Sequence, residues 1–170
     1  MKKDLQEIQE DFIQQWGILG SQWGINRTMA QIHALLMTTE KDLSTDEVME
    51  KLEISRGNAH SNLKELVGWG LIKVNTRKGD RKEYFEATKD VWTIFRCVTE
   101  GRLKREIIPA LEILKQCEND SSELEGKEAQ QFNNMMHELK DFVEIGVNLA
   151  PKVTKLSQSN AIQLALKLMP

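Results

Sequence analysis

Residues 44–87 read STDEVMEKLEISRGNAHSNLKELVGWGLIKVNTRKGDRKEYFEA and carry the strongest structural signals of the chain. Ser44 stands three residues before Glu47, which is the spacing of a capping box at the start of a helix. Ser55 is a favourable N-cap for a second helix. We therefore predict two helices joined by a tight turn at about residues 53–54.

The second predicted helix has one apolar face, on which Ala59, Leu63 and Leu66 recur at helical spacing. Its opposite face carries small and hydrogen-bonding groups, where a solvent-facing helix usually pairs acids with lysines. Small residues let a helix enter the major groove of DNA, Asn and Arg pair with base edges, and Ser and Lys suit phosphate. We expect Arg56 and Asn58 to read bases. The face predicted to contact DNA comprises Ser55, Arg56, Gly57, Asn58, Ser61 and Lys64.

A basic hairpin is predicted to follow this helix. Glycines within 68–70 end the helix, and residues 71–75 and 83–87 are β-compatible runs with Gly79 and Asp80 as the turn between them. A tip this basic is expected to hold phosphate or probe the minor groove. The cations of the tip are Arg77, Lys78, Arg81 and Lys82.

Helix, turn, helix and hairpin in this order predict a winged helix-turn-helix. The fold class is therefore mainly α with a small β-hairpin wing. The main alternative for the wing is a solvated charged loop, and its position next to the predicted recognition helix favours a DNA contact.

The charge of the chain is unevenly distributed. The 170 residues carry a formal net charge of −3 at pH 7, and 40% of them are hydrophobic. From Ser55 to Lys82 seven cations face two anions, so this segment is +5 and the remainder is −8. A basic reading surface on an acidic body suits a protein that contacts DNA on one face only.

Helices are predicted on the N-terminal side of this region. Residues 2–19 form an amphipathic helix, and Gly20 and Gly24 are expected to break it. A helix over residues 28–39 would then pack beneath the helix-turn-helix.

Helices are also predicted on the C-terminal side. Residues 89–117 form a long helix capped by Thr88, with a bend near Gly101 or Pro109. A loop separates it from a helix over residues 127–147. Pro151 is expected to separate a last helical segment, and the end piece of that segment (capped by Ser159) is apolar nearly all round.

These elements indicate three parts. Residues 1–27 are an N-terminal helix and aromatic junction, residues 28–88 the winged helix-turn-helix, and residues 89–170 a C-terminal helical region. The outer parts hold more helix than a DNA-binding head requires. Two-fold dimers read palindromic sites, so we expect the outer parts to form a homodimer.

The chain shows no signal peptide and no run of membrane-spanning length, which predicts a cytoplasmic protein with no membrane partner. Cys97 and Cys117 are expected to be reduced thiols in a bacterial cytosol. No Cys or His cluster indicates a metal, and no cofactor is predicted. His60 and Ser61 are neighbours on a helix and point apart, so we expect no enzymatic activity.

Several segments carry a family resemblance: ISRGNA at 54–59, WGLI at 69–72, KGDRKEY at 78–84, DVW at 90–92 and ALKL at 165–168. Together they resemble the GbsR branch of the MarR-type winged helix-turn-helix transcriptional regulators, over nearly the whole chain. The resemblance implies a dimeric bacterial regulator of transcription, for which we expect a repressor, dimerised through its long helices. Some members of that branch respond to choline or glycine betaine.

A ligand site is a further hypothesis. Trp16, Trp23, Trp92 and Phe95 lie where flanking helices meet the winged head. Aromatic faces bind quaternary ammonium groups by cation–π attraction, so these rings are candidates for a cage around choline or glycine betaine. The alternative is that they only pack in a core.

Two other functions remain open at this point. A winged helix can serve as a protein-interaction module, although such modules tend to lose the basic wing that this chain keeps. A regulator of the same fold can also sense oxidants through Cys97 or Cys117.

Overall fold

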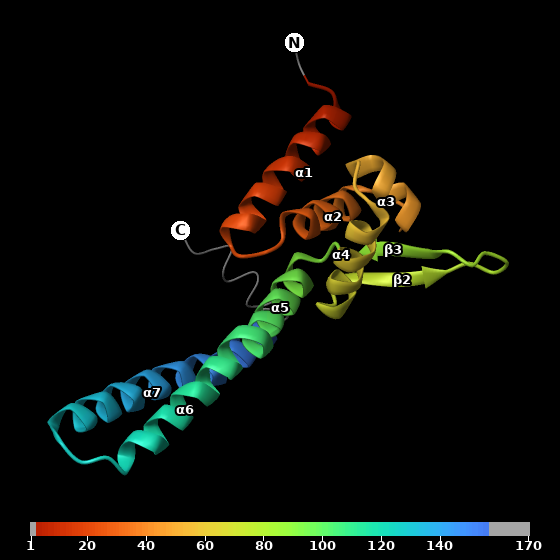
Figure 1. The fold of residues 1–170 in the computed structure, drawn as a ribbon. Helices are drawn as coiled ribbons and strands as arrows, with labels where there is room; N and C mark the ends of the chain where they lie inside the picture. The colour runs from red at the N-terminus through yellow and green to blue at the C-terminus, as the bar shows by residue number, and fades with distance from the viewer. Residues whose placement is uncertain (1–2, 157–170) are drawn as a thin grey trace. The chain divides into compact units, whose positions relative to one another are not determined.

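The computed structural model describes residues 3–156 (Figure 1). The chain divides into two compact units, one ending at Ile94 and the other beginning at Phe95. The first unit contains four helices and a small sheet, and the second contains helices only within the described residues. Within residues 3–156, no helix combines the length and the apolar character needed to cross a membrane.

The helices of the first unit begin at side-chain caps that the sequence specifies. Ser44 and Glu47 form the predicted capping box, with the Ser44 N–H donating to Glu47 Oε2 at 2.7 Å. Ser55 Oγ accepts from the Asn58 N–H at 3.3 Å and caps the second helix of the pair, as predicted. The four helices are α1 (Leu5–Gln22), α2 (Arg27–Thr38), α3 (Thr45–Leu52) and α4 (Arg56–Gly68).

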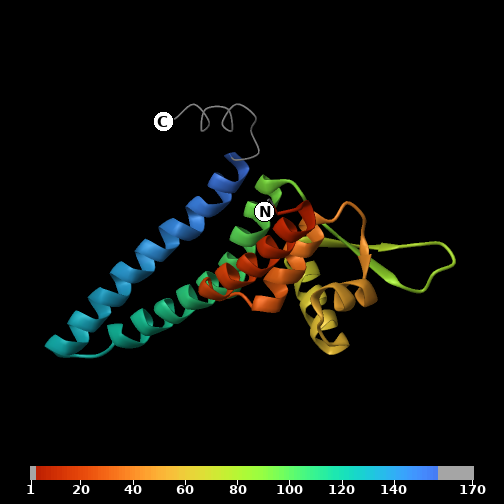
Figure 2. The same ribbon diagram turned by 90° about the horizontal axis from the view of Figure 1, so that it is seen from above.

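The sheet has three antiparallel strands in the order β1-β3-β2. They are β1 (Leu43–Ser44), β2 (Ile72–Thr76) and β3 (Glu83–Ala87). In the β2–β3 hairpin Val74 lies opposite Phe85. The loop of this hairpin extends away from the helices of the first unit (Figure 2). Gly79, at the predicted turn, has a φ of 84°, which glycine adopts without steric cost.

The core of the first unit lies under α4. Ile32 of α2, Val48 of α3, and Leu63 and Leu66 of α4 are its largest fully buried side chains. Ala59 adds a small residue with no exposed surface. The predicted apolar face of α4 is therefore the face that packs on the body. This observed arrangement confirms the mainly helical winged helix-turn-helix.

The predicted break at Gly20 is wrong, because α1 continues to Gln22. Gly20 is buried against α2, where a Cβ atom would lie 2.6 Å from the Cβ atom of Ala30. The glycine therefore allows two helices to approach closely and does not interrupt the first. Gly24, with a φ of 73°, follows the end of the helix.

The second unit begins within α5 (Val91–Arg102). The helix is capped by Asp90 and not by Thr88 as predicted, because the Asp90 carboxylate accepts from the Thr93 N–H at 2.8 Å. A bend was expected near Gly101 or Pro109, and the structure has a π-helical turn over Leu103–Ile107 in this region. Helix α6 (Ile108–Ser122) and helix α7 (Lys127–Leu156) follow as a hairpin.

Helix α7 runs through Pro151, so the predicted separation at this residue is wrong. A proline removes one helical N–H donor, and a long helix can accommodate that loss. The apolar end piece that we predicted to start at Ser159 lies outside the described residues.

A polar cluster joins α6 to α7 within the second unit. The Glu118 carboxylate lies 2.6 Å from Nδ1 of His137 and 2.9 Å from Nζ of Lys140. Hydrogen bonding from Lys140, followed by that from His137, lowers the pKa of Glu118. Asn133 donates to the carbonyl oxygen of Glu118 at 2.7 Å. These bonds set the register of the helical hairpin.

The core of the first unit contains a buried histidine, His33 of α2, which is 5% exposed. Its Nε2 atom has no hydrogen-bond partner among the described residues. Burial lowers the pKa of His33 from 6.5 to about 4, because charging the ring in the core is costly. His33 is thus neutral when folded and titrates near 6.5 when unfolded.

This difference predicts an acid-dependent loss of stability. Between pH 6.5 and 4 the unfolded chain binds a proton that the folded chain does not bind, so the free energy of unfolding falls as the pH falls. The loss attributable to His33 is on the order of 3 kcal/mol at pH 4. In urea denaturation, the fall in the free energy of unfolding between pH 7 and 4.5 should be much smaller for His33→Leu than for wild type. His60→Gln, on the exposed face of α4, is the matched control and should behave as the wild type. An equal loss in His33→Leu and wild type would contradict this account.

Candidate DNA-binding surface

The outer face of α4 is exposed and consists of small and polar residues. Gly57, His60, Ser61 and Lys64 are all exposed, and they recur at three or four residues, so they form one stripe along the helix. Nothing lies within 4 Å of a Cβ atom built on Gly57. The N-terminal turn of α4 is therefore open to a large ligand.

Asn58 does not belong to this exposed stripe. Its side chain is half-buried, and its Oδ1 accepts from Nδ2 of Asn62 at 2.7 Å. Its own Nδ2 donates to Oγ1 of Thr28 at 3.4 Å. The bond to Thr28 ties α4 to α2, so Asn58 helps to hold the helix in place. Its predicted contact with bases stays a prediction.

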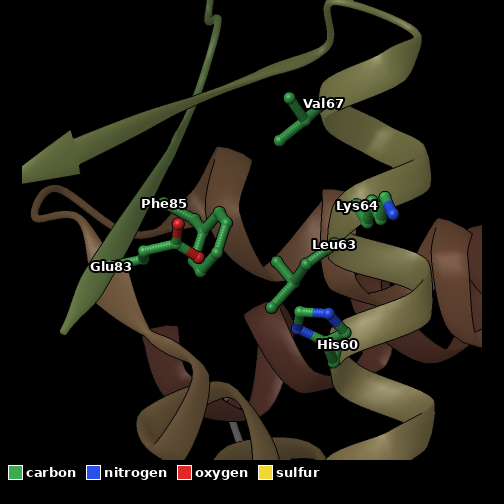
Figure 3. Close-up of a pocket in the computed structure, with 6 residues that line it drawn as sticks. All are labelled: His60, Leu63, Lys64, Val67, Glu83 and Phe85. Carbon is green, nitrogen blue, oxygen red and sulfur yellow. The ribbon is translucent and has the colours of Figure 1, made fainter.

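His60 was not among the residues predicted to contact DNA. It lines a shallow groove of about 280 Å³ between α4 and β3. In Figure 3, Glu83 and Phe85 of β3 face His60 and Leu63 of α4 across this groove. The sequence did contain a signal that His60 belongs to this surface: it stands three residues after Gly57, and that spacing places both on one helical face.

Arg77, the first residue of the wing loop, anchors the wing to the body. Its guanidinium donates to Asp42 Oδ1 at 2.5 Å and lies 3.6 Å from the centre of the Tyr84 ring. The hydrogen bond between Arg77 and Asp42 raises the pKa of Arg77 and lowers the pKa of Asp42. Half of the Arg77 side chain remains exposed. Arg77 therefore anchors the wing while keeping one face toward solvent.

The tip of the wing is organised by Asp80. Its carboxylate accepts from the Tyr84 hydroxyl at 2.7 Å and from the Lys82 N–H at 2.9 Å. The hydrogen bond from Tyr84, followed by the one from Lys82, lowers the pKa of Asp80. The acid that interrupts the basic tip thus shapes the loop.

The six cations of this surface form two groups. Three make ion pairs with acids: Arg56 and Lys82 with Asp46, and Arg77 with Asp42. The other three are Lys64, Lys78 and Arg81. They are exposed and make no ion pair within residues 3–156. Arg81 also lines a pocket of about 350 Å³ with Arg56, Asp46 and Ser44. Helix α4 and the wing thus present cations toward a common region.

Comparison with known proteins agrees with this architecture. Residues 23–83 match the model of the MarR family. The winged helix-turn-helix of this chain is therefore similar to that of the MarR family over these residues. A solved structure titled "Crystal Structure of a transcriptional regulator" is similar to this chain, with a TM-score of 0.71 and 17% sequence identity. The alignment covers 89% of this chain and 99% of that one. No curated protein matches the chain.

The residues predicted to bind a ligand lie outside the winged helix-turn-helix or at its margins. The Phe12 and Trp16 rings pack with centroids 5.4 Å apart, and Trp23 is 61% exposed. Trp92 is half-buried near the end of the first unit, whereas Phe95 belongs to the second. The aromatic cage therefore stays a prediction, as does the narrower likeness to the GbsR branch.

The contacts of Asn58 generate a test. Asn58→Ala removes hydrogen bonds to Thr28 and Asn62 and should lower the free energy of unfolding by about 1 kcal/mol. Through its predicted base contact, Asn58→Ala should also weaken binding to the preferred duplex by about 1–3 kcal/mol and change binding to a random duplex little. Urea denaturation and binding to the two duplexes measure both effects. Ser61→Ala, on the exposed stripe, is the control for stability and should leave the free energy of unfolding within about 0.5 kcal/mol of wild type. Equal weakening on both duplexes would contradict the base contact and leave Asn58 only its role in holding the helix.

Proposed function

We propose that this protein is a DNA-binding transcriptional regulator that binds duplex DNA through the outer face of α4 and the wing. The observation that carries the proposal is the exposed stripe of α4 beside a wing with exposed cations at its tip. A helix with small residues at its first turn can enter the major groove, and a basic hairpin beside it can reach phosphate or the minor groove. The match of residues 23–83 to the MarR family supports it.

The contacts divide by their chemistry. Lys64, Lys78 and Arg81 are exposed and make no ion pair in the described part of the chain, so they suit phosphate contacts. Arg56 begins α4 and is 70% exposed, which suits a base contact. Ser55 and Ser61 are small hydroxyl donors near the same face, suited to phosphate.

We infer that the protein acts as a homodimer. Along α7 an apolar stripe is exposed, including Phe142 at 75% and Ile145 at 59%. Helix α1 exposes Leu5 at 70% and Ile8 at 52%. Large exposed apolar stripes mark interaction surfaces, and a two-fold dimer would read a palindromic site. We propose repression as the regulatory outcome and a quaternary ammonium compound as the candidate effector, both by family resemblance.

Salt dependence tests the DNA-binding surface. Each phosphate contact adds about −0.9 to the slope of log affinity against log salt concentration. Arg81→Ala should weaken binding to all duplexes alike and make the slope shallower by about one. Fluorescence anisotropy with a labelled duplex over a salt series measures this. Lys51→Ala, an exposed cation of α3 outside the proposed surface, is the matched control and should leave the slope unchanged. A flat salt dependence of the wild type would contradict DNA binding.

The apolar stripe of α7 generates a second test. Phe142→Glu places a charge where the partner helix is expected, so it should convert a micromolar dimer to monomer and weaken operator binding. Sedimentation equilibrium measures the change in mass. Asn148→Asp adds the same charge elsewhere on the surface of α7 and should remain dimeric. If Phe142→Glu remains a dimer, this stripe is not the interface.

A further inference from the structure

Asp46 of α3 lies between the two parts of the proposed DNA-binding surface. Its Oδ1 accepts from Nη2 of Arg56 at 2.5 Å, and its Oδ2 lies 3.1 Å from Nζ of Lys82. Arg56 is the first residue of the recognition helix α4, and Lys82 stands at the end of the wing loop. One carboxylate therefore joins the helix that would enter the major groove to the wing beside it.

Stability does not account for this arrangement. The side chains of Asp46, Arg56 and Lys82 are 44%, 70% and 57% exposed, and ion pairs this exposed contribute little to folding. Hydrogen bonding from Lys82 and the charge of Arg56 lower the pKa of Asp46, so the carboxylate is ionised at neutral pH. What the two ion pairs fix is the position of the cations.

A guanidinium held in this way is prepared for base recognition. Arg has five N–H donors, and Asp46 accepts from Nη2 of Arg56 only, so donors remain for another partner. The most frequent base contact of Arg is the paired hydrogen bond to O6 and N7 of guanine. Restraining the side chain before binding lowers the conformational entropy lost on contact.

The same carboxylate discourages indiscriminate binding. A negative charge beside Arg56 and Lys82 repels DNA phosphates and competes with them for both cations. Specificity often requires such a repulsive element, because it weakens the wrong complexes more than the right one. The free donors of Arg56 can still meet a neutral base edge beside Asp46, whereas the charge of Asp46 repels a phosphate that approaches either cation.

We propose that Asp46 is a specificity-determining positioning residue, which directs Arg56 at a guanine and keeps Arg56 and Lys82 from binding phosphate at arbitrary sites. The inference rests on the proposed DNA-binding function and adds to it a residue outside the surface predicted from sequence.

The test compares wild type with Asp46→Asn and with a matched control, Glu50→Gln. Glu50 is exposed on the same helix, so the control removes the same charge without affecting Arg56 or Lys82. Affinity is measured for the site selected by wild type from random duplexes and for a random duplex, over a salt series. For Asp46→Asn we expect the ratio of the two affinities to fall about tenfold. Binding to the random duplex should tighten, with a slope steeper by about one.

A second background separates positioning from charge alone. In Arg56→Gln the guanidinium is absent, so adding Asp46→Asn should not lower the affinity ratio further. If the ratio falls by the same factor in both backgrounds, or if Asp46→Asn matches Glu50→Gln in ratio and slope, the role of Asp46 is wrong. A wild type that shows no preference among duplexes would overturn the proposed function itself, and this inference with it.

Discussion

The packing of α4 on the body of the first unit is the constraint on which the remaining arrangement depends. Leu63 and Leu66 of α4 are buried with Ile32 of α2 and Val48 of α3, and burying side chains of this size contributes about 1.5–3 kcal/mol each. This contact fixes the rotation of α4 about its axis. Ala59 on the inner face brings the helix close to the body, and Asn58 joins it to α2 by a hydrogen bond to Thr28. Because the apolar face of α4 is buried against the body, the polar stripe on the opposite face points to solvent.

Acidic side chains give the basic surface its geometry. Asp42 holds the wing through Arg77, and Asp46 joins the wing to α4 through Lys82 and Arg56. A charge tally along residues 55–82 misses both acids, because they precede that segment in the sequence. The surface is therefore less positive than the linear count of +5 indicates, but ion pairs with Asp42 and Asp46 hold three of its cations in defined positions. Such a balance favours selective over non-specific binding.

Local signals predicted the central region well, because its elements begin and end where their own residues dictate. Ser44 and Ser55 cap α3 and α4, and Gly79 lies in the wing turn, as expected. The prediction failed at Gly20, where a tertiary contact decides the outcome. Gly20 meets Ala30 of another helix, and a lone sequence does not contain that contact. The contact of Asn58 with Thr28, 30 residues away in sequence, was not predicted either, and the base contact of Asn58 stays a prediction.

If α4 and the wing together form the surface that holds DNA, a bound duplex should protect both from solvent. Hydrogen–deuterium exchange of the full chain, with and without a duplex at low salt, measures this protection. We predict slower exchange in the first turns of α4 and in residues 77–82, with little change at the tip of the α6–α7 hairpin. Protection confined to the helical hairpin, or none in α4, would contradict the account.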